Sequence, residues 1–317
     1  MSSENLSDRC ALATEELAEV ERLLELFKSA KKRAIEMGEP LVAASASIAL
    51  ARAIEMLEAK VTVSVSRAEK VFGEYFLGPK EIEGCFRIKL EKIPPIQFKK
   101  ADLERARALG QMLILQIDRD ANGDPLTIER MRTILPTVRG SGATPRLAIQ
   151  DWYLNENFFK NEVPDLGWRL VSHECIPRSK GEDYEYQTEM MIRYIKTKLF
   201  DTRLPQVYED AITQFEQYQR SRPWGPHVTY QRRMAAEFEQ LSITKLTRET
   251  AIEAVYRKVL GQHQRGPNWF TDEGWTRSST SDSAFVEVEV VNQAIRIFAG
   301  IVESAGENRG VIFSRRV

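Results

Sequence analysis

The sequence predicts an α+β protein with an N-terminal helical hairpin, a mixed middle region and a β-rich C-terminal part. Apolar residues recur at helical spacing near the N-terminus, whereas Phe285 to Val290 alternate with period two, as in a half-buried strand. Glycine and proline cluster at Gly78-Pro79 and from Gly140 to Pro145, between these parts. We therefore expect three domains, at residues 1–77, 78–146 and 147–317.

The bulk composition is that of an ordinary globular protein. The chain has 317 residues, of which 43% are hydrophobic and 29% are charged, and its formal net charge of −1 gives no global case for nucleic-acid binding. Residues 1–9 show no secretory signal, and no apolar stretch reaches about 20 residues. We therefore expect a cytoplasmic protein without a membrane partner.

The sequence lacks the cysteine and histidine motifs of a zinc site and the glycine-rich motifs of a nucleotide site. The three cysteines, Cys10, Cys85 and Cys175, lie far apart and form no CxxC pair, which argues against a zinc site and a disulfide framework. The three histidines show neither H-x-H nor H-E-x-x-H spacing, and no glycine-rich phosphate-binding motif occurs. The sequence therefore predicts no metal and no cofactor.

Two amphipathic stretches predict the helical hairpin. Residues 5–36 and 41–72 each place apolar residues at helical spacing, and Gly38-Glu39-Pro40 interrupts them. The second helix could instead end near Lys60, because Val61 to Val65 also alternate like a strand. The hairpin suits a dimerisation or docking arm, which would give a homo-oligomer. Packing of the hairpin on its own chain is an equal alternative.

The middle region predicts alternating strands and helices. Residues 85–90 alternate as a strand, and Pro94-Pro95 ends it. A helix is predicted over residues 100–112, followed by a buried strand over 113–117 and a helix over 127–135.

The segment from Asp118 to Glu129 matches the calcium-loop pattern D-x-[DN]-x-[DN]-G-x5-E. Pro125 departs from the aliphatic residue usual at its position, and Leu113 to Ile117 reads as a strand where an EF-hand needs a helix. A strand–turn–helix connection with Asn122-Gly123 as the turn is the alternative that we favour.

The third domain is predicted to contain one strand, four helices and a final group of short strands. The first strand spans Leu166 to Ile176, and the helices cover residues 184–200, 204–218, 230–241 and 248–260. The final strands cover residues 285–290, 294–298 and 310–314, joined by loops that carry Glu289 to Asn292 and Gly300 to Asn308.

Polar and aromatic residues in the same region give an alternative function as an enzyme whose site forms only in the fold. The candidates are Asp151, Trp152, His173, Glu174 and Asp183. A basic stretch with interleaved aromatics, residues 218–233, gives a second alternative as a nucleic-acid-binding accessory protein. Acidic residues near that stretch dilute its charge, so a solvated helix face is the better interpretation.

Three segments carry a resemblance to a family of proteins from small-genome candidate-phyla bacteria that has no assigned activity. They are Leu109 to Leu115, Leu166 to Ser172 and Phe313-Ser314-Arg315. The resemblance covers residues 94–135 and 147–317. It implies a relationship in sequence but no enzymatic activity, because none is assigned to that family.

A second resemblance concerns the C-terminal end. Trp275 to Ser279, followed by Phe285 to Val288, is similar to the end of C-type-lectin-like domains. Such ends occur in the Fibrobacter major-paralogous domain, in formylglycine-generating-enzyme-like proteins and in targets of diversity-generating retroelements. The resemblance therefore implies a C-terminal C-type-lectin-like domain at residues 147–317.

The lectin-like resemblance implies both a strand pairing and a limit on chemistry. In such domains the first and last strands pair, which would place residues 167–176 beside 309–317, with helices 184–200 and 204–220 packed on the sheet. Formylglycine-generating oxidases need reactive cysteines in their C-terminal half. This chain has none after Cys175, so we expect no oxidase activity.

The resemblance to retroelement targets also implies a set of ligand contacts, because loops before the final strand bind partners in those proteins. The matching positions are Glu289, Val291, Asn292, Gln293, Arg296, Phe298, Glu303 and Asn308, joined by Trp275 and Arg277 of the motif itself. We therefore expect a non-enzymatic protein that binds a protein ligand through these residues. An enzyme, or a calcium- or nucleic-acid-binding accessory protein, is the alternative.

Overall fold

The computed structural model describes most of the chain beyond residue 62. The described residues are 22, 28–29, 32–33, 35–38, 63–135, 146–148, 150–200, 203–221, 235–266, 269–270, 273–282, 284–300 and 309–316. The chain divides into two compact units, Met1–Thr62 and Val63–Val317, so the domain boundaries expected after residues 77 and 146 lie inside the second unit. Most of the expected hairpin lies outside the described residues.

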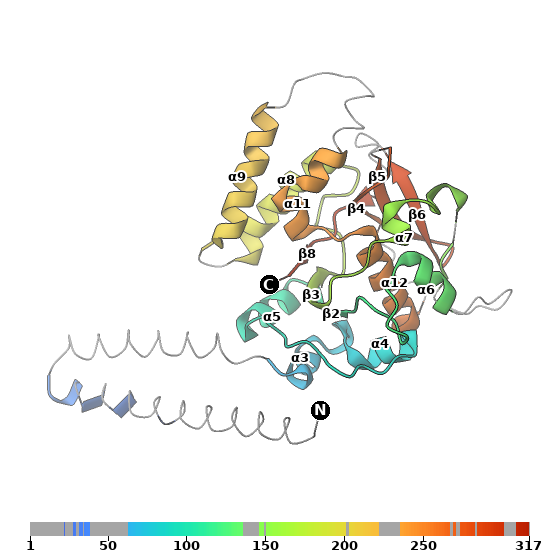
Figure 1. Ribbon diagram of the computed structural model, residues 1–317. Coiled ribbons are helices and arrows are strands. Elements are labelled where there is room, and N and C mark those ends of the chain that lie inside the picture. The colour runs from blue at the N-terminus through green and yellow to red at the C-terminus, as the bar shows by residue number, and fades with distance from the viewer. Residues whose placement is uncertain are drawn as a thin grey trace. The chain divides into compact units, whose positions relative to one another are not determined.

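The first sheet of the second unit brings together strands that are far apart in the sequence (Figure 1). Its order is β1 (Phe76–Leu77), β2 (Gln111–Gln116), β3 (Gly167–Ser172) and β8 (Ser314–Arg315). β1 runs parallel to β2, and the other pairs are antiparallel. Every residue of β2 is buried, which confirms the buried strand predicted there.

The second sheet is built from the C-terminal strands. Its order is β6 (Ala294–Gly300), β5 (Phe285–Val291), β4 (Glu273–Ser279) and β7 (Arg309–Gly310). Asn292 and Gln293 join β5 to β6 with φ values of 49° and 66°. Positive φ at both central residues is the signature of a tight two-residue hairpin turn.

One C-terminal segment joins the two sheets. β7 pairs with β4, and four residues later β8 pairs with β3 through Leu170 opposite Arg315 and Val171 opposite Ser314. Between them, the amide of Ile176 donates to the carbonyl of Val311 at 2.9 Å. The pairing implied for residues 167–176 and 309–317 is therefore observed.

The remaining elements are helical. The N-terminal part of the unit contains α3 (Val65–Phe72), η1 (Gly73–Tyr75), α4 (Pro79–Phe86), α5 (Lys100–Ala108), α6 (Ile128–Ile134), η2 (Asp151–Tyr153) and α7 (Asn157–Lys160). The C-terminal part contains α8 (Tyr184–Tyr194), the π-helical turn η3 (Ile195–Leu199), α9 (Gln206–Ser221), α11 (Ser242–Thr247) and α12 (Ala251–Arg265), and residues 235–240 are also helical. These elements confirm the α+β class and the helices predicted over 127–135, 184–200, 204–218 and 248–260.

Helix α12 is the central element of the unit. It contacts β2 of the first sheet and β4, β5 and β6 of the second (Figure 1). Thr250 and Glu253 form a capping box at its start, and every residue from Ala251 to Gln262 is buried. A helix buried on all sides is typical of a protein core, so α12 holds both sheets in place.

Two predicted strands are corrected by the structure. Residues 79–86 form α4 because Pro79 occupies the first turn and the Glu81 carboxylate accepts the Gly78 amide at 2.8 Å. Its buried residues Ile82, Cys85 and Phe86 are spaced for one helix face, so the strand predicted at 85–90 is wrong. β3 ends at Ser172, so the strand expected to continue to Ile176 is shorter.

Three further differences concern the C-terminal region and the end of α5. The strand predicted over 310–314 is two short strands in different sheets, because the chain crosses between the sheets at residues 311–313. β4 and α11 were not predicted, since neither shows an apolar period of its own. Helix 100–112 ends at Ala108, where Gly110 adopts φ 70° and the chain turns into β2.

The segment from Asp118 to Glu129 is a strand–turn–helix connection. β2 precedes it, as a strand and not the helix of an EF-hand. Oδ2 of Asp120 accepts Arg130 Nε at 2.5 Å, and its Oδ1 accepts the amides of Asn122 and Asp124 at 2.8 and 3.0 Å. Both oxygens of Asp120 are thus engaged by the protein, which argues against the calcium interpretation.

Candidate ligand-binding site

Strand register places four of the expected ligand contacts, together with Glu287, on one face of the second sheet. Trp275 on β4 lies opposite Glu287 on β5, and Glu287 lies opposite Phe298 on β6. Glu289 lies opposite Arg296 in the same ladder. Directly opposite residues of an antiparallel pair share a face, and so do residues two apart on one strand. All five side chains therefore lie on the same side of the sheet.

Trp275 occupies the buried end of this face. It is only 3% exposed, and its ring lies edge-on to Phe285 with centroids 5.9 Å apart. A Cβ atom at Gly300 would lie 2.3 Å from the Trp275 ring, so the indole packs directly on the β6 backbone. Trp275 is therefore part of the core, and we correct its assignment as a surface contact.

A buried ion pair stands next to Trp275. The Glu287 side chain is 1% exposed, and its Oε2 lies 2.7 Å from Nε of Arg309, which is 26% exposed. The Arg309 guanidinium also lies 5.2 Å from the centre of the Trp275 ring. Glu287 belongs to the alternating pattern of β5, but nothing local in the sequence points to a partner 22 positions away, and neither residue was predicted as part of the site.

The exposed part of the face lies toward the hairpin turn. Glu289, Arg296 and Phe298 are half-buried on the strands, and Asn292 and Gln293 are exposed at the turn. We call these five residues the β5–β6 face. Arg296 and Phe298 lie on β6, as the strand predicted over 294–298 implies. Glu289 was also assigned to a loop over Glu289 to Asn292, and that placement is wrong because the loop is only the two-residue turn.

The remaining expected contacts are elsewhere or not described. Arg277 lies on β4, is half-buried, and its amide donates to the carbonyl of Glu249 at 2.8 Å. Val291 is half-buried at the end of β5. Glu303 and Asn308 lie outside the described residues. Three charged or aromatic strand residues and two turn residues thus form the candidate surface.

The enzyme candidates are only partly brought together. His173 and Glu174 line a cavity of about 230 Å³ beside Tyr75 and Tyr194. The His173 ring is held edge-on between Tyr75 and Trp269, with centroids 5.2 and 4.9 Å away. It is therefore packed among aromatic rings, immediately after β3 and not on it.

The other three enzyme candidates have different positions and roles. Asp183 caps α8, where its Oδ1 accepts the amide of Tyr186 at 2.7 Å. Asp151 and Trp152 lie in η2, and the Trp152 ring packs edge-on to Tyr153 at 4.9 Å. None of the three lines the cavity at His173, so the structure does not assemble the proposed set.

Neither a metal site nor a membrane span is found in the part of the chain that the structure describes. There, no three His, Cys, Asp or Glu side chains are grouped so that they could hold a metal ion. No described helix has both the length and the apolar character needed to cross a bilayer.

Comparison with known proteins found no relative of this chain. No family model, curated protein or solved structure matches the chain. The candidate surface therefore rests on the strand register and the side-chain contacts of the structure itself.

Proposed function

We propose that this protein is a non-enzymatic binding protein that holds a protein ligand on its β5–β6 face. The observation that carries the proposal is the half-exposed row of Glu289, Arg296 and Phe298 on a sheet braced from behind by α12. Aromatic and arginine side chains are enriched at the centres of protein interfaces, where they supply most of the binding energy.

The support beneath this surface favours recognition over catalysis. Phe298 is directly opposite Glu287, whose ion pair with Arg309 ties β5 to the C-terminal segment. A side chain held on a paired strand loses little conformational entropy when a ligand binds, so more of the contact energy appears as affinity. The face combines several hydrogen-bonding groups with one aromatic ring, a composition that suits a protein surface.

The order of elements supports a lectin-like interpretation of this unit. β3 is followed by α8 and α9, then by β4, β5 and β6, and the chain returns to pair β8 with β3. This is the closure implied by the resemblance to C-type-lectin-like domains. As part of the proposal, the protein is a target of a diversity-generating retroelement, acts in the cytoplasm, and assembles through its N-terminal hairpin.

A peptide display selection tests the binding function. A random peptide library would be selected on the full chain, and the dissociation constants of the recovered peptides would be measured on purified variants. Because an interface anchor typically contributes more than about 1 kcal/mol, we expect Phe298→Ala and Arg296→Ala each to weaken binding by about tenfold.

The matched control is Val207→Ala, which truncates a residue that is 52% exposed on α9. It should leave the dissociation constants unchanged. Peptides that bind the two β5–β6 variants as tightly as the wild type would contradict the proposal.

Gene sequences from closely related cells test the retroelement target separately. Variation should concentrate at the codons of Glu289, Asn292, Gln293, Arg296 and Phe298, while Phe285, Val311 and Phe313 in the core stay constant. If these codons are uniform among related cells, the proposal of a diversified surface is contradicted. The binding function is tested separately by the peptide selection.

A further inference from the structure

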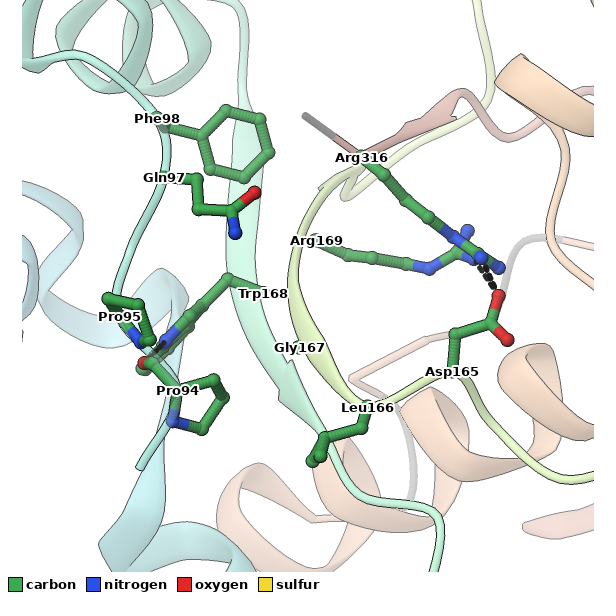
Figure 2. A pocket seen from close by; sticks show the side chains of 10 residues that line it. All are labelled: Pro94, Pro95, Gln97, Phe98, Asp165, Leu166, Gly167, Trp168, Arg169 and Arg316. Atoms are coloured by element: carbon green, nitrogen blue, oxygen red, sulfur yellow. Dashed lines mark hydrogen bonds and ion pairs between the residues drawn. The ribbon is translucent and has the colours of Figure 1, made fainter. Parts of the chain in front are cut away.

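A separate cavity of about 200 Å³ lies between the extended segment 94–98 and the start of β3 (Figure 2). Pro94, Pro95, Gln97 and Phe98 form one side, and Asp165, Arg169 and Arg316 form the other. Trp168 reaches across from β3, and its indole nitrogen donates to the carbonyl of Pro94 at 2.8 Å. We call this space the Trp168 cavity.

The charged side of the Trp168 cavity is electrically balanced. Oε1 of Glu253 accepts Arg169 at 2.5 Å and Arg316 at 2.8 Å, and both guanidinium groups also pair with Asp165. Two cations and two anions in one cluster cancel at short range, so the cavity presents no net field that would select a charged ligand. It still presents polar groups, including a buried Nε of Arg169 that has no partner among the described residues.

The opposite side combines apolar surface with one amide. The Gln97 side chain is exposed, and its amide faces the cavity in Figure 2. Pro95 is exposed beside it, and the largely buried rings of Phe98 and Trp168, 3% and 6% exposed, also line the cavity. A group that packs here needs a planar apolar body and a neutral tip that exchanges hydrogen bonds.

The size and the rim of the cavity favour a side chain of another protein over a free small molecule. A volume of about 200 Å³ is below the range of roughly 300–1,000 Å³ that is usual for small-molecule pockets. Leu166, which lines the cavity, is 60% exposed, and neighbouring Ile93 is 42% exposed. A small pocket with an exposed apolar rim is the geometry in which a single anchor side chain docks.

We propose that the Trp168 cavity receives one tyrosine side chain of a protein partner. The phenol ring packs against Trp168 and Pro95, and its hydroxyl hydrogen-bonds to the amide of Gln97. Tyrosine is the natural side chain that joins a flat apolar ring to a neutral hydrogen-bonding tip. This site uses none of the residues of the β5–β6 face and stands apart from the function proposed for it.

Fluorine NMR on the full chain tests this proposal directly. The five tryptophans would be labelled as 5-fluorotryptophan and their signals assigned with single Trp→Phe variants. N-acetyl-tyrosinamide should shift the Trp168 signal in a saturable way. The phenylalanine analogue should bind about three- to tenfold more weakly because it lacks one hydrogen bond, and the charged lysine and aspartate analogues should bind more weakly still.

Two variants and a control make the result decisive. Gln97→Ala, at an exposed position, should reduce the affinity for the tyrosine probe to that for the phenylalanine probe and leave the latter unchanged. Leu166→Ala should weaken both probes, and Val207→Ala should weaken neither. The proposal is overturned if no probe saturates the Trp168 signal, if a charged probe binds as tightly, or if Gln97→Ala has no effect on the tyrosine probe.

Discussion

Nε of Arg309 lies 2.7 Å from Oε2 of Glu287, and this contact joins β7 at the edge of the second sheet to β5 near its centre. Glu287, directly opposite Phe298, is almost fully buried, whereas Arg309 keeps about a quarter of its side chain exposed. The ion pair therefore supports the β5–β6 face from within and links it to the segment that crosses to β8.

Removing the arginine should destabilise the protein more than an average substitution. Breaking a buried pair leaves a buried carboxylate without its counter-charge, which costs about 3–5 kcal/mol when both groups are fully buried. Because Arg309 is 26% exposed, we expect Arg309→Ala to lower the free energy of unfolding by about 2–3 kcal/mol. Urea unfolding followed by circular dichroism measures this change.

The control for this prediction is an exposed ion pair. Lys80 and Glu69 lie 3.3 Å apart with side chains 79% and 43% exposed, so Lys80→Ala should cost less than about 1 kcal/mol. If Arg309→Ala and Lys80→Ala lower the free energy of unfolding equally, the Glu287–Arg309 ion pair stabilises the protein no more than an exposed ion pair.

The contact between Gly300 and Trp275 gives a second prediction. A methyl group at Gly300 would lie 2.3 Å from the indole, so Gly300→Ala must displace the ring or the strand. Overpacking of this kind costs about 1–3 kcal/mol, and the same urea experiment would detect it. Gly84→Ala is the matched control, because the nearest atom to its Cβ is 3.5 Å away and the residue lies inside α4. That change should be neutral or stabilising by up to about 1 kcal/mol.

Asp120 should contribute stability at neutral pH that is lost in acid. Burial favours the protonated form, but the hydrogen bonds from Arg130 and from the amides of Asn122 and Asp124 outweigh it and lower the pKa of Asp120. A carboxyl whose folded pKa lies below the unfolded value of about 3.9 stabilises the fold above that pH and loses this contribution as the pH falls through the folded value. Asp120→Asn should lower the melting temperature at pH 7, and the difference from wild type should shrink below about pH 4. A difference independent of pH would contradict this account.

Glu162 should show the opposite pH dependence. Burial, reinforced by the nearby carboxylate of Glu239, raises the pKa of Glu162 against the hydrogen bond from Ser278. Because its pKa is raised in the folded state, the protonated Glu162 contributes most to stability in acid. This contribution is lost as the pH rises through the folded pKa. Glu162→Gln should therefore raise the melting temperature at pH 8 and leave it unchanged near pH 3. A lower melting temperature at pH 8 would contradict the predicted direction.

Local signals predicted much of the fold. β2, α6, α8 and α12 were each expected within a few residues of their observed bounds, and the structure adds side-chain caps at Thr127 before α6 and Thr250 before α12. The strand predicted at 85–90 failed because its alternation competed with a capped helix start at Gly78-Pro79. A short alternating run cannot outweigh a proline and a capping carboxylate, which fix the first turn of a helix.

The sequence predicted several residues of the candidate site but not how they are arranged. Glu289, Arg296 and Phe298 come together because β5 and β6 pair around a turn of two residues, and the sequence was interpreted as having longer loops there. Glu287 and Arg309 meet only through the order of strands in the sheet. Such contacts depend on chain topology, which local periodicity does not encode.

The most direct test of the central claim is a map of where a selected peptide protects the protein. Hydrogen–deuterium exchange of the full chain would be measured with and without a peptide recovered from the display selection. We predict slower exchange in the segment from Glu287 to Phe298, with no change at 165–169 beside the Trp168 cavity. Protection confined to other segments, with the β5–β6 face exchanging as in the free protein, would contradict the proposal that this face is the binding surface.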